Sequence, residues 1–282
     1  MKDSRRRFFK KAGSAVVACS MLSTVFANGK SVIPREESGS INDLFNIGIA
    51  GYTFVKFNLE QSLEMTERVD VKFLCIKDFH LPLDSIGGQI DAFHDKLKVR
   101  NITGYAVGPI YMRSETEVDK AFAYAKRVGV KLIIGVPDHE LLPYVDKKVK
   151  EYNYKLAIHN HGVDDKRYPS LDSIFEKIKN LDRRIGICHD IGYSAQMGFS
   201  PAALTYKYGD RIYDMHIKDI TKAAKSGVDC VIGRGVIDFP ELIKALRATK
   251  YSGKCSIEMA SADPLPVIAE SVGFLKGVMK NA

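Results

Sequence analysis

Short apolar runs alternate with longer amphipathic segments along most of this 282-residue chain. The short runs have the length of β-strands, and the longer segments repeat their apolar residues every three or four positions, as an α-helix does. The expected strands are Asn46–Ala50, Phe73–Lys77, Val99–Val107, Lys131–Val136, Lys155–Asn160, Ile185–Asp190, Ile212–Lys218 and Lys254–Met259.

The segment Glu115–Val128 shows the clearest helical pattern. Its apolar side chains fall on one face, and Gly129 stands where a helix commonly ends. Further helices are expected at Asp172–Ile178, Phe239–Ala248 and Pro264–Met279, with Asp238 as the N-cap of the second.

Eight strands, each followed by a helix, predict a single parallel (β/α)8 barrel, or TIM barrel, over residues 45–282. A doubly wound open sheet is the alternative. A dinucleotide-binding sheet of that kind carries G-x-G-x-x-G after its first strand, and the segment Gly48–Tyr52 lacks the third glycine. No break in composition divides the barrel region, so one domain is expected.

The charge of the chain is concentrated at its N-terminus. The formal net charge is +8, and the first 27 residues hold six basic side chains and one acidic, which leaves +3 for residues 28–282. A nearly neutral body without tryptophan gives little support for binding a nucleic acid backbone. We therefore expect no nucleic acid partner.

The N-terminal segment 1–27 has the pattern of a twin-arginine export signal. Ser4–Lys10 contains the paired arginines, the apolar stretch Ala12–Phe26 follows, and cleavage is expected after Ala27. A lipoprotein-like cleavage before Cys19 is the alternative, and a lipid on Cys19 would then be the protein's one attachment to the membrane. Residues 28–44 are polar and are expected to form a linker. The sequence thus predicts an exported, periplasmic protein.

Four cysteines follow the leader, and none belongs to a C-x-x-C pair. This excludes a zinc ribbon and a thioredoxin-like motif. Three of the four lie within apolar, strand-like runs, so we expect them to be small buried side chains.

Polar residues gather where the expected strands end, which is where (β/α)8 barrels carry their chemistry. Five of the seven histidines are among them. The set comprises Lys77, Asp78, His80, His159, Asn160, His161, His189, Asp190, Tyr193, His216, Lys218, Asp219, Ser256 and Glu258. Imidazole and carboxylate groups converging from successive strands predict one divalent metal ion, with Mn²⁺, Co²⁺, Zn²⁺ and Mg²⁺ all compatible. The same polar set could also bind the hydroxyl groups of a sugar.

The stretch 45–280 resembles the xylose-isomerase-like TIM-barrel superfamily, the group of sugar isomerases and epimerases. The motifs that carry the resemblance are Leu156–Gly162, Cys188–Tyr193, His216–Asp219, Gly233–Phe239 and Ile257–Glu258. Their order and spacing are fairly specific for the superfamily, and they do not specify a substrate.

The resemblance implies a ligand set for the metal. In that superfamily a glutamate ends strand five, an aspartate ends strand six, a histidine stands on strand seven and a glutamate ends strand eight. Asp190, His216 and Glu258 match this pattern, whereas His159 occupies the strand-five position and Tyr193 stands where a histidine is common. With His159 as fourth ligand, the set becomes two histidines and two carboxylates.

The resemblance also implies roles for neighbouring residues. Lys218 is expected to polarise the substrate, with Asp219 orienting it; a solvated salt bridge at the barrel rim is the alternative for this pair. The expected catalytic residues are Glu258, His159 and Lys218. The expected substrate-binding residues are His80, His161, Tyr193 and Arg234.

These expectations define a reaction that begins with removal of the proton α to a carbonyl. The leading hypothesis is a metal-dependent isomerase or epimerase acting on an unphosphorylated sugar or cyclitol, because phosphorylated substrates are mostly cytoplasmic. A lyase that cleaves 3-keto-glycosides by β-elimination is the first alternative, since it needs one base and suits the loss of the strand-five glutamate. A carbohydrate-binding protein without catalysis is the second. A DNA-repair endonuclease on the same barrel is disfavoured, because it needs a larger ligand set for three zinc ions.

Overall fold

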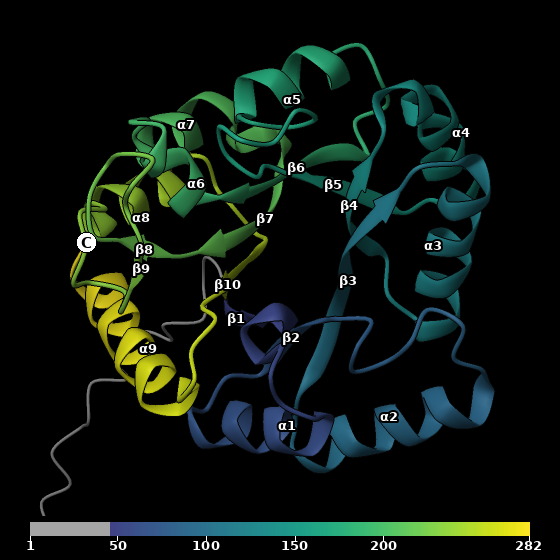
Figure 1. Cartoon of the computed structure of the whole chain (residues 1–282), viewed down its shortest axis with the longest axis horizontal. Coiled ribbons are helices and arrows are strands. Elements are labelled where there is room, and N and C mark those ends of the chain that lie inside the picture. The colour runs from purple at the N-terminus through teal and green to yellow at the C-terminus, as the bar shows by residue number, and fades with distance from the viewer. Residues whose placement is uncertain (1–45) are drawn as a thin grey trace, which may run out of the picture. The chain divides into compact units, whose positions relative to one another are not determined.

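Eight parallel strands close into a barrel in the computed structural model, which describes residues 46–282 (Figure 1). Around the barrel the strand order is β1-β10-β7-β6-β5-β4-β3-β2. The strands are β1 (Asn46–Ala50), β2 (Phe73–Ile76), β3 (Thr103–Met112), β4 (Leu132–Pro137), β5 (Lys155–His159), β6 (Ile185–Asp190), β7 (Ile212–Ile217) and β10 (Lys254–Ile257). The predicted (β/α)8 barrel is therefore confirmed. The predicted export signal, the linker and Cys19 lie outside the described residues.

Helices surround the barrel and cover the outer face of its strands (Figure 1). They are α1 (Leu59–Arg68), α2 (Gly87–Val99), α3 (Glu115–Val128), α4 (Leu142–Tyr152), α5 (Leu171–Ile178), α6 (Ile191–Gln196), α7 (Pro201–Tyr208), α8 (Phe239–Ala248) and α9 (Pro264–Asn281). Short 3-10 turns occur at Gly51–Phe54, His139–Leu141 and Gly209–Arg211. Within residues 46–282, no helix is long and apolar enough to cross a membrane.

The clearest predicted helix, α3, begins and ends where the sequence indicated. The Ser114 side chain accepts a hydrogen bond from the Glu117 backbone N–H at its start, and Gly129 adopts a left-handed conformation (φ 78°) at its end. Asp238 caps α8 in the same way, by accepting from the Glu241 N–H. Local capping chemistry thus fixes both helices.

The predicted third strand was wrong by several residues. Val99 ends α2 and is 81% exposed, and Asn101 turns the chain with a φ of 52°. β3 therefore begins at Thr103 and continues to Met112 instead of ending at Val107. The apolar side chain of Val99, at the end of α2, extended the strand-like pattern toward the N-terminus.

A small antiparallel ribbon follows β7 and was not predicted. It pairs β8 (Asp219–Ile220) with β9 (Asp229–Cys230). The Asp219 carboxylate accepts hydrogen bonds from the backbone N–H groups of Gly233, Gly235 and Ile237. One buried side chain therefore folds the glycine-containing loop that leads into α8.

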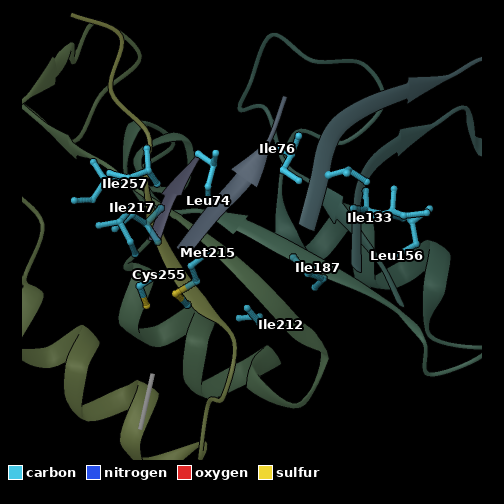
Figure 2. Close-up of a cluster of buried hydrophobic side chains, with 14 of the residues drawn as sticks. Leu74, Ile76, Ile133, Leu156, Ile187, Ile212, Met215, Ile217, Cys255 and Ile257 are labelled. Atoms are coloured by element: carbon cyan, nitrogen blue, oxygen red, sulfur yellow. The ribbon is translucent and has the colours of Figure 1, made fainter. Parts of the chain in front are cut away.

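Alternate residues of each strand belong to two different apolar layers. One layer packs with the helices and includes Leu74, Ile76, Ile133, Leu156, Ile187, Ile212, Met215, Ile217, Cys255 and Ile257 (Figure 2). The other is a small cluster inside the barrel, formed by Cys75, Ala106, Ile134, Ala157 and Cys188. Cys75, Cys188 and Cys255 are buried free thiols, which confirms the prediction for three of the four cysteines; Cys230 is half-buried.

Candidate metal centre

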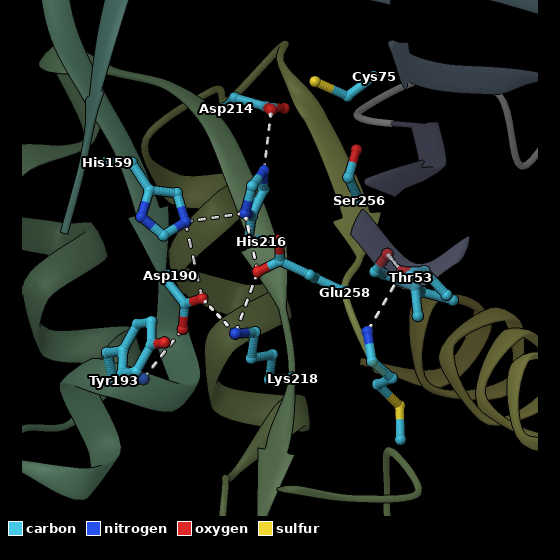
Figure 3. A network of polar contacts seen from close by, with 12 residues as sticks. Thr53, Cys75, His159, Asp190, Tyr193, Asp214, His216, Lys218, Ser256 and Glu258 are labelled. Carbon is cyan, nitrogen blue, oxygen red and sulfur yellow. Dashed lines mark hydrogen bonds and ion pairs between the residues drawn. The ribbon is translucent and has the colours of Figure 1, made fainter. Parts of the chain in front are cut away.

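Four side chains from neighbouring strand ends meet in the barrel (Figure 3). His159 ends β5, Asp190 ends β6, His216 stands on β7, and Glu258 follows β10 directly. All four are buried, and their candidate ligand atoms lie within 4.8 Å of one another. The residues that the sequence predicted as metal ligands are therefore brought together.

The distances between these atoms match a shared metal ion. Nε2 of His159 lies 2.9 Å from Nδ1 of His216 and 3.8 Å from Oδ2 of Asp190, and Nδ1 of His216 lies 3.2 Å from Oε2 of Glu258. Two ligands bound at about 2.1 Å in tetrahedral geometry stand about 3.4 Å apart. The donor set and its spacing fit one divalent cation.

Two of the four side chains, His159 and Glu258, have the protonation state that a metal ligand needs. Burial, together with the neighbouring His216 and His161, holds the pKa of His159 well below its ordinary value, so its imidazole is neutral. Burial alone would raise the pKa of Glu258, but Lys218 and His216 outweigh it and hold that pKa well below the usual range. A neutral imidazole and an ionised carboxylate are the forms that bind metals.

Lys218 lies inside this cluster. Its Nζ atom is 2.9 Å from Oδ2 of Asp190 and 3.0 Å from Oε2 of Glu258, and it stands 4.6 Å above the centre of the Tyr193 ring. Gly192 leaves the necessary space, because a Cβ there would lie 2.9 Å from the Cβ of Lys218. The Lys218 side chain is 10% exposed, so the alternative of a solvated salt bridge at the rim is wrong.

Asp219 does not have the role that the sequence indicated. Its carboxylate oxygens are taken by the backbone N–H groups of the 233–237 loop, as described above, and by that of Ile220. The residues that hold the Lys218 ammonium are Asp190 and Glu258. Successive strand residues point to opposite faces, which separates Asp219 from its neighbour.

A cavity of about 210 Å³ opens onto the cluster. Its lining residues are Tyr52, Lys77, Pro109, Tyr111, His159, His161, Tyr193, Lys218 and Glu258. Glu258 is the one carboxylate in this lining, because Asp190 lies beneath the surface of the cavity. A larger surface hollow of about 650 Å³ shares Tyr111 but contains none of the ligand residues.

Two of the four predicted substrate-binding residues line the cavity. His161 and Tyr193 both do, and Nε2 of His161 lies 3.1 Å from the Tyr111 hydroxyl. Gly162, with a φ of 82°, lets the chain turn closely past Tyr193, since a Cβ there would lie 3.0 Å from its ring.

The other two predicted substrate-binding residues, His80 and Arg234, lie outside the cavity. His80 follows a turn after β2 that buries its ring, with Nε2 3.1 Å from Ser62 Oγ and 3.3 Å from the Phe57 carbonyl oxygen. Arg234 belongs to the loop held by Asp219, and its guanidinium pairs with Glu270 on α9 at the surface. Neither residue lines the cavity, so the structure gives neither of them contact with a substrate there.

Four lining residues are absent from the predicted site, and one of them is Pro109, which lies on β3 beyond the expected end of that strand. Lys77 belongs to the polar residues predicted at the end of the second strand, but the sequence assigned it no role. Tyr52 lies in the 3-10 turn after β1. Tyr111 lies beyond the point where the third strand was expected to end, so the misplaced end of that strand hid it.

Comparisons with known proteins agree with this geometry. The family model of the xylose isomerase-like TIM barrel matches residues 51–278. The rhizopine catabolism protein MocC of Rhizobium meliloti is 30% identical over 140 residues, which cover 42% of this chain and 40% of that protein. An inosose dehydratase of Clostridium beijerinckii is 23% identical over 238 residues, which cover 79% of this chain and 72% of that protein.

A solved structure shares the fold. The IolI protein, crystallised with a bound zinc atom, aligns with a TM-score of 0.68 at 18% identity, over 83% of this chain and 96% of that chain. The chain spans less than half the length of MocC but nearly three quarters of the Clostridium dehydratase.

Proposed function

The chain belongs to the xylose isomerase-like TIM-barrel family, and on this basis we propose that it is a metal-dependent lyase. Its substrate would be an unphosphorylated keto-sugar, keto-cyclitol or keto-glycoside, and its reaction a β-elimination next to the carbonyl. The observation that carries the proposal is that Glu258 is the one carboxylate lining the cavity.

A single carboxylate base in the cavity favours elimination over epimerisation. An epimerase needs proton-transfer groups on opposite faces of the substrate, and the strand-five position that could supply the second is His159. Nε2 of His159 faces the other ligands, and a neutral imidazole bound through one nitrogen carries a proton on the other. His159 therefore has no free lone pair with which to act as a base.

His159, Asp190, His216 and Glu258 would hold the metal, which when bound supplies Lewis-acid polarisation of the substrate carbonyl. A free oxygen of Glu258 takes the α-proton, and the electrons of the broken C–H bond form the C=C bond as the β C–O bond breaks. The departing oxygen takes a proton from a donor in the cavity, so that water or an alcohol leaves. Lys218 is the proposed donor, because it lines the cavity and its ammonium, paired with Asp190 and Glu258, lies next to the base.

The relatives support an elimination. The matches include several proteins named inosose dehydratase, and a dehydratase removes water. The proposed export of this chain favours substrates without phosphate. An isomerase would share the first step and differ only in returning the proton to the neighbouring carbon.

The test is a screen of purified protein loaded in turn with Mn²⁺, Co²⁺, Zn²⁺ or Mg²⁺. Inososes, free ketoses and 3-keto-glucosides are incubated in D₂O and followed by proton NMR and by the ultraviolet absorption of an enone. We expect loss of the β-substituent and a conjugated product. Formation of an isomer or epimer without elimination would reject the lyase, and absence of both exchange and turnover would leave a binding protein.

A further inference from the structure

A second carboxylate lies directly below the metal centre. Asp214 precedes His216 by two residues on β7, so both side chains point into the barrel. Both are completely buried. Asp214 thus occupies the layer beneath the ligands, a position otherwise filled by small side chains such as Ala157 below His159 and Cys188 below Asp190.

The Asp214 carboxylate is held in place from the opposite side of the barrel. The Tyr105 hydroxyl, on β3, lies 3.1 Å from its Oδ1 and 2.9 Å from its Oδ2, and 2.5 Å from the Ser256 hydroxyl on β10. Tyr105 therefore holds this side chain, and Ser256 in turn holds the Tyr105 hydroxyl. Burying a carboxylate is costly, and a side chain of similar volume without charge would pack more cheaply.

The ion-pair contact of Asp214 is with His216. Its Oδ2 atom lies 4.0 Å from Nε2 of His216 (Figure 3). That nitrogen is buried and has no hydrogen-bond partner, whereas Nδ1 of the same ring faces His159 and Glu258. A metal bound through Nδ1 requires that the proton sit on Nε2, where it faces Asp214.

We propose that Asp214 is a positioning residue for His216. Its Oδ2 atom faces Nε2 of His216 as an acceptor, which favours the tautomer with the proton on Nε2 and orients the ring so that Nδ1 points to the metal. The distance of 4.0 Å is longer than a hydrogen bond, and a shift of about 1 Å would close it to one. The inference rests on the metal centre of the proposed function, and it names a residue that positions one of the metal ligands.

The first experiment measures metal affinity by titrating metal-free protein with Co²⁺ and recording its visible absorption. Asp214→Asn should weaken Co²⁺ binding about 10–100-fold, the usual effect of losing an outer partner of a histidine ligand. The asparagine oxygen would accept from Tyr105, which turns its NH₂ group toward His216 and opposes the required tautomer. Asp214→Leu, which removes both polar atoms, should weaken binding to a similar extent.

Ser256→Ala is the matched control, since it alters the same buried network and keeps both Asp214 and the Tyr105 hydroxyl that holds it. It should keep Co²⁺ affinity close to that of the unchanged protein. Equal affinity in Asp214→Asn and the unchanged protein would overturn the inference, as would an equal loss in Ser256→Ala. Failure of the unchanged protein to bind Co²⁺ would instead reject the metal centre and both proposals.

A second measurement needs no substitution. In zinc-loaded protein labelled with ¹⁵N-histidine, long-range ¹H–¹⁵N correlations should show His216 bound through Nδ1 with its proton on Nε2. Binding through Nε2 would overturn the inference, even if the variants at position 214 failed to fold.

Discussion

Nε2 of His159 and Nδ1 of His216 face each other at 2.9 Å in the buried end of the barrel. Two imidazole nitrogens at this distance share either a proton or a metal ion. Because burial keeps His159 neutral, its lone pair is available to a metal. His159 can therefore serve as a metal ligand but not as a second base.

The first prediction follows from this pair. His159→Glu should retain one bound metal and add a carboxylate on the strand-five side of the cavity. We expect α-proton exchange from a second face, and hence detectable epimerisation of a keto-sugar that the unchanged protein does not epimerise. Proton NMR in D₂O measures the exchange, and elemental analysis measures the metal. Rapid epimerisation by the unchanged protein would contradict the argument, because it needs a second base.

The second prediction concerns Glu258. Glu258→Gln should lower the rate of α-proton exchange by about 10²–10⁴, the usual cost of losing a general base. Since Glu258 is also a ligand candidate, the variant is assayed at saturating metal with its occupancy measured. A matched ligand variant, Asp190→Asn, changes a carboxylate that does not line the cavity. If both variants lost the same activity at full metal occupancy, Glu258 would be a ligand and not the base.

Much of the fold could be predicted from the sequence because the patterns that determine its strands and helices are local. The apolar runs of β1 and β6 and the caps of α3 and α8 lie within a few residues of one another, and both strands and both helices have the expected bounds. The predicted start of β3 was wrong because Val99 continues the apolar pattern of the sequence, although its position at the end of α2 leaves it exposed. Nothing local distinguishes an exposed valine at a helix end from the start of a strand.

The ligand set was also predictable, because strand ends of a parallel barrel converge and the motifs are specific. The roles of His80 and Arg234 were not, since a single turn after β2 and the hydrogen bonds of Asp219 decide where these side chains point. The sequence also provided no indication that Asp214 has a role next to the metal ligands. Its position depends on Tyr105, which lies 109 residues away in the chain and meets it only inside the closed barrel.

The third prediction tests the corrected role of Asp219. Asp219→Ala removes the acceptor of three backbone N–H groups in the 233–237 loop and should lower the free energy of unfolding by about 3 kcal/mol. Because the ammonium of Lys218 is held by other carboxylates, Co²⁺ affinity should be nearly unchanged. Urea unfolding and Co²⁺ titration measure the two quantities. Loss of metal affinity with unchanged stability would restore the idea that Asp219 orients Lys218.

The fourth prediction concerns the pH dependence of stability at His80. Burial lowers the pKa of His80 in the folded protein, while in the unfolded chain it returns to about 6.5. As the pH falls through 6.5, the unfolded chain binds a proton that folded His80 does not yet accept. The contribution of His80 to stability is therefore complete above pH 6.5 and declines as the pH falls toward the folded-state pKa, with a limiting slope of about 1.4 kcal/mol per pH unit.

His80→Gln keeps a side chain able to reach Ser62 and the Phe57 carbonyl but removes the titrating group. The unchanged protein should be the more stable at pH 8, and the difference in free energy of unfolding should shrink between pH 6.5 and pH 5. Other buried histidines titrate in both proteins and cancel in this difference. Urea unfolding is measured with a chelator present, because metal binding adds its own pH dependence. A difference that stays constant from pH 8 to pH 5 would show that His80 accepts its proton as readily in the folded protein as in the unfolded chain.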